Sequence, residues 1–310
     1  YEYLEKRFDL KTRSLAAVLF LVQRGLGTGL TIYAPAIILS AILGWNLTYM
    51  NIFIGISVII YTFSGGTKAV NVTQKQQMFV IMLGMFSTFF LILHYLPNDM
   101  TFSSALHIAG ANDKMNIVDF SFDPEQKYTF WSGITGGFFL ALAYFGTDQS
   151  QVGRYLSGKS VRESQMGLIM NGLLKVPMQF FILLTGVMVF VFFQFNPVPL
   201  NFNPNNKTVI ENSKYKKEYQ ALENKLNALS EDKKVINLLY IDQLNQDYDN
   251  PTLRKELVAL SNKEKDLRDR AKDIISKADP DSETNDKDYV FFHFVLNYLP
   301  KGLIGLLLAV

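Results

Sequence analysis

The sequence predicts an all-α, polytopic membrane protein. Five stretches of mostly apolar residues, cut by short connections, dominate the first two-thirds of the chain: 14–43, 50–65, 77–96, 128–146 and 166–195. A helix needs about 20 apolar residues to cross a bilayer core, where only helices and closed barrels satisfy the backbone. Because these runs are continuous and do not alternate with polar residues, they favour helices over barrel strands.

Charged residues are distributed unevenly along the chain. The whole chain is 49% hydrophobic with a formal net charge of +2, which resembles a soluble protein, but residues 201–287 hold 33 of the 58 charged side chains. The remainder is therefore much more apolar than the average. The absence of cysteine excludes disulfides and thiolate metal sites, and the near-zero net charge does not suggest a nucleic-acid partner.

Both ends of the chain fall inside longer patterns. Residue 1 lies within a basic segment with no start methionine or signal peptide, and the last residues belong to an apolar run. We therefore expect an internal piece of a longer, transporter-like protein.

The basic residues of the short connections predict an orientation, since Lys and Arg in such connections mark the cytoplasmic side. They precede the first span, lie between the second and third, and lie between the fourth and fifth: Lys6, Arg7, Lys11, Arg13, Lys68, Lys75, Arg154, Lys159 and Arg162. The other connections carry few Lys or Arg residues. We expect a multi-pass protein of a bacterial-type inner cell membrane, with residues 197–288 on the extracytoplasmic side.

The polar insertion, residues 197–288, has a helical period of its own. Apolar residues recur at steps of three and four in two segments: Tyr215, Tyr219, Leu222, Leu226 and Leu229, then Leu253, Leu257, Leu260 and Leu267. Asn250 followed by Pro251 is a good helix start. Because a narrow apolar seam needs a partner helix, we expect two or three amphipathic helices in an antiparallel hairpin. A flexible solvated loop and a ligand-binding role are the alternatives.

The last stretch, residues 289–310, follows the insertion as a third region after the membrane helices of residues 1–196. This stretch is long enough for a membrane span, but Pro300 is favourable only at the start of a helix and destabilises the interior of one. We expect a short amphipathic helix to about Asn297 and a new membrane helix that starts near Pro300.

Arg24 is the first polar residue in an unfavourable place, about ten residues into the first span. An Arg at the membrane centre costs about 2.5–3.5 kcal/mol on insertion scales, so it must face a bundle interior or a wet cavity. Its guanidinium suits bidentate binding of a carboxylate. We expect Arg24, with the adjacent Gln23, to contact an anionic group of a solute; pairing of Arg24 with Asp148 is the alternative.

Lys175 lies at a similar depth in the fifth span, two residues before Pro177. It either contacts a polar group of a solute or pairs with backbone carbonyls that the proline frees. A third polar cluster ends the fourth span, where Tyr144 and Phe145 are followed by Gly146 and residues 147–151. This pattern is typical of a helix that lines a cavity, although an ordinary helix end at the interface looks similar.

The sequence offers no positive support for an enzyme. It has no Walker motif, nucleophile elbow or His/Glu metal cluster, and its three histidines are scattered without metal-ligand spacing. We therefore expect neither catalytic residues, nor a cofactor, nor a resident metal.

Four segments together resemble the sodium:solute symporter family, the sodium/glucose-type transporters. Residues 61–77 resemble its signature Y-x-x-x-G-G-x-x-A-V-x-x-T-D-x-x-Q, and residues 148–154 are similar to its N/D-Q-x-x-V-Q-R element. Residues 3–8 and 299–306 resemble the segments that precede the third and eighth core helices. The similarity covers nearly all of the chain except residues 205–287.

The resemblance implies a leucine-transporter-type fold of ten core helices in a five-plus-five inverted repeat, with substrate and ions bound near the midplane at broken helices. The five spans are then core helices 3 to 7, followed by the start of helix 8. Sodium is implied as the coupling ion. Its main ligands belong to core helices 1 and 8 of the family, so we expect that site to lie outside this fragment.

The family's functional positions carry over only in part. Tyr144 and Lys175 stand where sugar-carrying members have a tyrosine and a lysine at the site, and Arg24 is comparable with an arginine of members that carry acidic substrates. Gln74 replaces an aspartate implicated in sodium passage, and Ala141 replaces an asparagine of sugar carriers. We expect Gln74 and Asp148 to lie on the ion pathway.

Together these observations predict sodium-coupled symport of a small anionic or zwitterionic solute by alternating access. The predicted substrate-binding residues are Gln23, Arg24, Tyr144, Phe145, Gln149 and Lys175. We expect Arg24 and Lys175 to share one watery cavity, because two cations lie at mid-depth with few acids. A membrane-embedded solute sensor, a sugar symporter and a channel are the alternatives, although the spans lack the repeated pattern of a channel filter.

Overall fold

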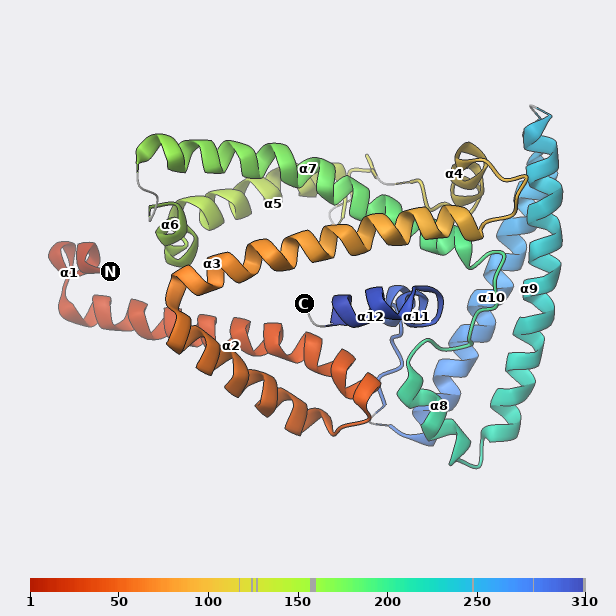
Figure 1. Cartoon of the computed structure of the whole chain (residues 1–310), viewed down its shortest axis with the longest axis horizontal. Coiled ribbons are helices and arrows are strands. Elements are labelled where there is room, and N and C mark those ends of the chain that lie inside the picture. The colour runs from red at the N-terminus through yellow and green to blue at the C-terminus, as the bar shows by residue number, and fades with distance from the viewer. Residues whose placement is uncertain are drawn as a thin grey trace. The chain divides into compact units, whose positions relative to one another are not determined.

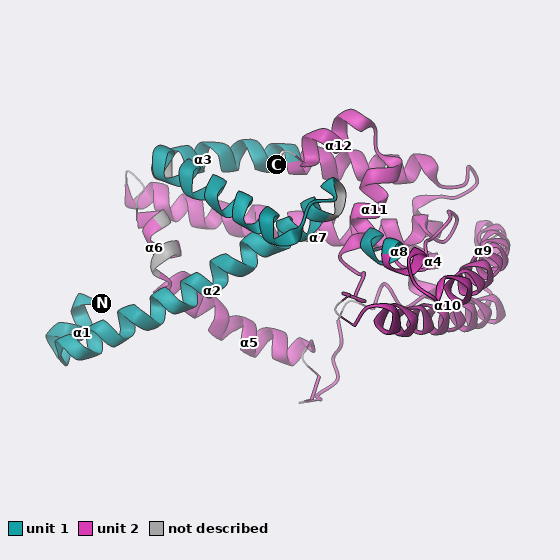
Figure 2. Cartoon of the chain, turned by 90° about the horizontal axis from the view of Figure 1, so that it is seen from below, with its two compact units in different colours: residues 1–80, 203–208 teal, residues 81–202, 209–310 magenta. Residues whose placement is uncertain are grey.

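The computed structural model describes residues 1–116, 118–123, 125–126, 128–156, 160–246, 248–280 and 282–308. The side chains of residues 41, 42, 67, 68, 149, 150 and 154 lie outside this description. Within the described part, all regular structure is helical (Figure 1). The chain forms two compact units, residues 1–80 with 203–208, and residues 81–202 with 209–310 (Figure 2).

Four segments among the described residues are long and apolar enough to cross a membrane: Leu10–Ser40, Leu47–Gly66, Ala69–Tyr95 and Val161–Phe192. They correspond to the first, second, third and fifth expected spans. The fourth expected span, residues 128–146, is instead a 13-residue α-helix, α5 (Phe130–Leu142), continued by a five-residue π-helix, η1 (Ala143–Thr147). The all-helical, membrane-spanning class is therefore confirmed, with a break in the fourth span.

The first unit contains α1 (Glu2–Arg7), α2 (Leu10–Leu43) and the first part of α3 (Leu47–Tyr95). Asp9 caps α2, because its Oδ1 accepts a hydrogen bond from the backbone N–H of Thr12 at 2.7 Å. Gly44 ends α2 in the left-handed conformation with φ of 68°. The 18-residue window that identifies the first span has no residue buried inside the structure, as expected of a helix that needs lipid or other helices around it.

A single kink replaces the expected connection between the second and third spans. The connection is shorter than the expected bounds of the two spans implied, because one candidate span ends at Gly66 and the next begins at Ala69. Gly66 has φ of 56° and ψ of −165°, which interrupts α3 between two helical parts. A residue with a side chain rarely adopts this conformation, so glycine permits the kink. The polar residues after it do not prevent a helix, since none of them is proline.

The membrane part of the second unit contains the end of α3, α5, η1, α6 (Gln149–Leu156) and α7 (Val161–Phe192). Phe181 of α7 stacks on the end of α3, with its ring centroid 4.5 Å from that of Phe86 and 5.4 Å from that of Phe89. Further along α7, Phe192 packs 4.7 Å from Tyr298 and 4.9 Å from Phe294 of α11 (Tyr289–Tyr298). These aromatic contacts fix the distal half of α7.

The end of the chain agrees with the expected break at Pro300. α11 stops at Tyr298, and α12 runs from Lys301 to Leu308. The two helices are therefore separate, as the cost of an internal proline predicts.

Two long helices, α9 (Lys216–Asn245) and α10 (Pro251–Ala278), lie side by side in the insertion (Figures 1 and 2). They run antiparallel, because Tyr240 near the end of α9 bonds Asp249 just before α10, whereas Leu226 packs with Ile274 and Ile275. Asn250 caps α10 and Pro251 is its first residue, as predicted. The short helix α8 (Pro204–Glu211) precedes the hairpin.

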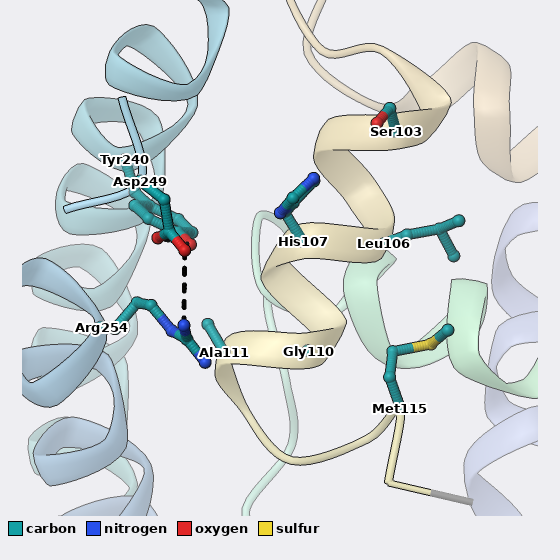
Figure 3. Close-up of a pocket in the computed structure, with 9 residues that line it drawn as sticks. All are labelled: Ser103, Leu106, His107, Gly110, Ala111, Met115, Tyr240, Asp249 and Arg254. Atoms are coloured by element: carbon teal, nitrogen blue, oxygen red, sulfur yellow. Dashed lines mark hydrogen bonds and ion pairs between the residues drawn. The ribbon is translucent and has the colours of Figure 1, made fainter. Parts of the chain in front are cut away.

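The hairpin is attached to α4 (Phe102–Ala111), a short helix that also packs on α7. Ser261 of α10 donates a hydrogen bond to the side chain of Asn112 at 2.7 Å, and Asn245 donates to the carbonyl of Asp99 at 3.1 Å. Figure 3 shows the space beside these contacts, where His107 projects from α4 toward the hairpin and Arg254 bonds Asp249. These hydrogen bonds attach the hairpin to the segment around α4. An attached helical hairpin argues against the alternative of a flexible solvated loop.

Candidate functional site

The π-helix η1 shapes the site, because it ends the fourth span with a wider turn. The backbone N–H of Asp148 donates to the carbonyl of Ala143 at 3.0 Å, the i to i−5 bond of a π turn. Thr147 donates its hydroxyl to the same carbonyl at 2.9 Å. The wider turn contains Tyr144 and Phe145. Their rings pack edge to face, with 5.0 Å between the ring centroids. Single π turns inside helices are frequent at functional sites.

Tyr155 of α6 connects η1 to α7. Its hydroxyl donates a short hydrogen bond to the carbonyl of Phe145, and its own carbonyl accepts one from the hydroxyl of Ser164. Asp148 stabilises the start of α6, because its Oδ1 accepts from the backbone N–H of Gln151 at 3.3 Å. These hydrogen bonds to backbone carbonyls hold η1, α6 and α7 together.

A cavity of about 510 Å³ lies between η1, α6 and α7. Its volume is within the roughly 300–1,000 Å³ that small-molecule sites occupy. Tyr144 and Phe145 line one side, and Gln151 and Tyr155 line another. The exposed ammonium-bearing side chain of Lys175 lines the α7 side. The cavity thus combines two aromatic rings, several hydrogen-bonding groups and a cation.

The α7 wall is one face of that helix. Ser164, Gly167, Asn171 and Lys175 are separated by three, four and four residues, which places them in line along the helix surface. Gly167 leaves open space beside it, since no atom lies within 4 Å of the position that a Cβ would take. Three of these four residues are polar, which is unusual for a membrane span.

The structure brings together three of the predicted substrate-binding residues, Tyr144, Phe145 and Lys175. Asp148, expected on the ion pathway, is half-buried at the start of α6. The side chain of Gln149 lies outside the described residues.

The remaining predicted residues, Gln23, Arg24 and Gln74, belong to the first unit. Gln23 and Gln74 are exposed, and the half-buried Arg24 lies over the ring of Phe20, with Cζ 5.5 Å from the ring centroid. Their place in one cavity with Lys175 stays a prediction, as does the pairing of Arg24 with an acid.

Sequence reasoning included Gln151 in the polar cluster after η1 but missed four other lining residues with polar side chains: Tyr155, Glu163, Ser164 and Asn171. The signal for two of them was present, because Ser164 and Asn171 recur with Lys175 at helical spacing. Tyr155 had no such signal, since its role depends on the turn between α6 and α7. Among the described residues no group of three or more His, Cys, Asp or Glu side chains is suited to a metal.

Comparison with known proteins identifies similar sequences among transporters. The family model of the sodium:solute symporter family matches residues 1–225. Sodium-coupled monocarboxylate transporter 2 of Mus musculus is 36% identical over 172 residues, 55% of this chain and 27% of the relative. Sodium-coupled monocarboxylate transporter 1 of Homo sapiens is 36% identical over 171 residues, 55% of this chain and 28% of the relative.

A third relative is named for a different solute, iodide. The sodium/iodide cotransporter of Homo sapiens is 33% identical over 173 residues, 55% of this chain and 26% of the relative. The chain spans about a quarter of the length of these relatives. All three are transporters and not enzymes, in line with the sequence prediction. The match over residues 1–225 shows that the chain belongs to the sodium:solute symporter family.

Proposed function

We propose that this chain forms part of a sodium-coupled symporter for a small organic anion, with the cavity between η1, α6 and α7 as a segment of the solute pathway. The observation that carries the proposal is the position of Lys175, which lines a cavity of about 510 Å³ together with Tyr144 and Phe145. A cation beside aromatic rings and hydrogen-bonding groups suits a carboxylate with a short apolar portion.

The relatives support an anionic solute. Two are named for monocarboxylates and one for iodide, and both kinds of solute are anions. The second mid-span cation, Arg24, belongs to the same proposal as a further contact for an anionic group of the solute. Sodium is the co-transported ion, and Gln74 and Asp148 are the proposed contributors to its passage in this chain.

The finer features of the sequence prediction belong to the same proposal. We place the five spans as core helices 3 to 7 of a five-plus-five inverted repeat, with residues 197–288 as an extracytoplasmic domain and α12 at the start of core helix 8. The protein then lies in the cell membrane and alternates access to a midplane site.

Uptake into proteoliposomes by the full-length protein tests the proposal. A sodium gradient should drive accumulation of one member of a panel of short monocarboxylates. Lys175→Met should reduce this uptake by about tenfold or more, as expected when a charge-assisted contact is lost. Lys175→Arg should retain part of it, and Lys11→Met, which removes an exposed lysine at the start of α2, should retain all of it.

Three results would contradict the proposal. Uptake of a neutral sugar in place of every anion favours the sugar-symporter alternative. Solute binding without any sodium-driven flux favours a sensor. A rapid ion current that no solute gradient changes favours a channel.

A further inference from the structure

A second cavity, of about 610 Å³, lies where the insertion meets the distal end of α7. α7 contributes Gly186, Val189 and Phe190, Phe193 follows directly at its end, and α10 contributes the facing polar side. The cavity is separate from the one that contains Lys175, because the two share no lining residue and Gly186, the lining residue of α7 nearest to Lys175, is 11 positions or roughly 16 Å further along the helix. All of its lining residues belong to the second unit.

The lining has a large excess of positive charge. Six cationic side chains face three carboxylates: Lys114, Lys233, Lys265, Arg268, Lys272 and Lys287 against Glu264, Asp269 and Asp286. The insertion as a whole is almost neutral, with 16 Lys and Arg against 17 Asp and Glu in residues 201–287. The positive charge is therefore concentrated in this cavity and does not reflect the composition of the domain.

The three carboxylates are already used by the fold. Glu264 accepts from Lys233 and from Arg268, each at 3.0 Å. Asp269 pairs with Lys272 at 3.3 Å. Asp286, which is buried, accepts from the backbone N–H of Phe202 at 2.9 Å.

Three lysines remain without a carboxylate. Among the described residues, no acidic oxygen lies within 4.0 Å of the ammonium groups of Lys114, Lys265 or Lys287, and all three side chains are exposed. Lys114 lies over the ring of Phe190, with Nζ 5.2 Å from the centroid. Like charges gathered in one cavity repel one another, so this arrangement favours a bound anion.

The opposite side of the cavity is apolar and aromatic. Phe190, Val198 and Val290 are half-buried there, while Phe193 and Phe202 are buried beneath them. Arg268 covers Phe202, with Cζ 5.2 Å from the ring centroid, and donates to the carbonyl of Leu200 at 3.1 Å. An anion that fits both sides carries its charge at one end and a compact apolar group at the other.

We propose that this cavity binds a small organic carboxylate from the aqueous phase, with the carboxylate near Lys265 and Lys287 and the apolar group against Phe190. Such a site gathers carboxylates at the surface of the protein on the side where the insertion lies. The proposal does not depend on transport, because binding here requires neither sodium nor a gradient.

Equilibrium dialysis of radiolabelled benzoate against the full chain in phosphatidylcholine nanodiscs tests the proposal. The variant Lys265→Ala/Lys287→Ala should bind benzoate about tenfold or more weakly than the parent, as expected for two lost charge-assisted contacts. The matched control Lys263→Ala/Lys277→Ala removes two exposed lysines of α10 that do not line the cavity, and it should bind like the parent. Omission of sodium should leave benzoate binding by the parent unchanged, which distinguishes this site from the sodium-coupled pathway of the transport proposal.

Uncharged benzamide, which has nearly the same shape, should not bind. The proposal is overturned if benzoate does not bind, if the Lys265/Lys287 variant binds as tightly as the parent, or if benzamide binds as well as benzoate. A further arm uses nanodiscs that contain phosphatidylglycerol. Loss of benzoate binding there would assign the site to a lipid headgroup and overturn the aqueous source.

Discussion

Lys233 on α9 and Glu264 on α10 form an ion pair inside the insertion, with 3.0 Å between Nζ and Oε2. Their side chains are 5% and 24% exposed, so both charges are largely removed from water. Glu264 accepts from Arg268 through its other oxygen, also at 3.0 Å. Because a one-turn slip of either helix would separate these groups, the network specifies the register of the hairpin.

Loss of the carboxylate should therefore destabilise the hairpin. Glu264→Gln leaves Lys233 buried without a counter-charge, and breaking a buried pair in this way costs about 3 kcal/mol or more. Hydrogen exchange of the full chain should report this as a lower free energy of local opening in α9 and α10. Asp266→Asn is the control, because Asp266 forms an exposed pair with Arg270 worth only about 0.2–0.5 kcal/mol. Equal effects of the two variants would contradict the role of burial.

The same network predicts a pH dependence. Burial alone raises the pKa of Glu264, but attraction by Lys233 and Arg268 and their hydrogen bonds outweigh it and bring the pKa below its ordinary value of 4.5. A carboxyl with a lowered folded pKa stabilises the fold above its unfolded pKa and loses that contribution as the pH falls through the folded value. Protection of α9 and α10 should therefore decline below pH 4.5. The Glu264→Gln variant should lose part of this decline, and an unchanged slope would rule out Glu264 as its source.

Asn237 should weaken the hairpin that contains it. Its side chain is fully buried on α9, and neither Oδ1 nor Nδ2 has a hydrogen-bond partner among the described residues. A buried polar group without a partner costs about 1–3 kcal/mol. Asn237→Leu, which is similar in size, should raise the free energy of opening by about that amount. Asn237→Ala controls for packing and should not stabilise; a destabilising leucine would show that the amide has a partner in solution.

The kink in α3 should depend on Gly66. Its φ of 56° is unfavourable for any side chain, although no atom lies within 4 Å of the position that a Cβ would take. Gly66→Ala should therefore act through the backbone alone and cost about 1–3 kcal/mol. Because the chain lacks cysteine, spin labels at Ile52→Cys and Val72→Cys should report a changed distance across the kink. Gly55→Ala, at an equally open position in the same helix, should leave that distance unchanged.

Tyr155 should position the aromatic rings of the transport cavity. Tyr155→Phe removes the hydroxyl that donates to the carbonyl of Phe145 but keeps the ring. The loss of one hydrogen bond, about 1 kcal/mol, should raise the KM for uptake roughly fivefold with a smaller change in kcat. Tyr128→Phe, whose side chain is 92% exposed, is the matched control. A fall in kcat alone would place Tyr155 outside the binding step.

Much of this architecture could be predicted from apolar run length and periodicity. The hairpin followed from the Leu and Tyr steps and from Asn250–Pro251, since a long amphipathic helix has few alternatives. Lys175 could be recognised because a charge within a span is costly wherever the helix packs. Tyr144 and Phe145 could be placed near it because they precede a dense polar segment.

Other features depend on geometry that composition does not contain. The π turn at η1 requires one bond to shift from i−4 to i−5, and no residue type specifies that choice. Polar residues interrupt the apolar run after Gly66, yet the chain stays helical there and changes direction at a kink at this one glycine. Ser164 and Asn171 carry no charge, so they do not stand out until their helical spacing from Lys175 on α7 gives them a shared face.

Pro177 lies between the two cavities that share α7. It cannot donate to the carbonyl of Leu173, so the helix has a missing bond just after Lys175. Beyond it, Phe181 and Phe192 are held by α3 and α11, whereas the preceding half is connected mainly to α6. Bending should therefore be easiest at this hinge, where the proximal arm can tilt and reshape the pathway around Lys175 while the insertion stays seated.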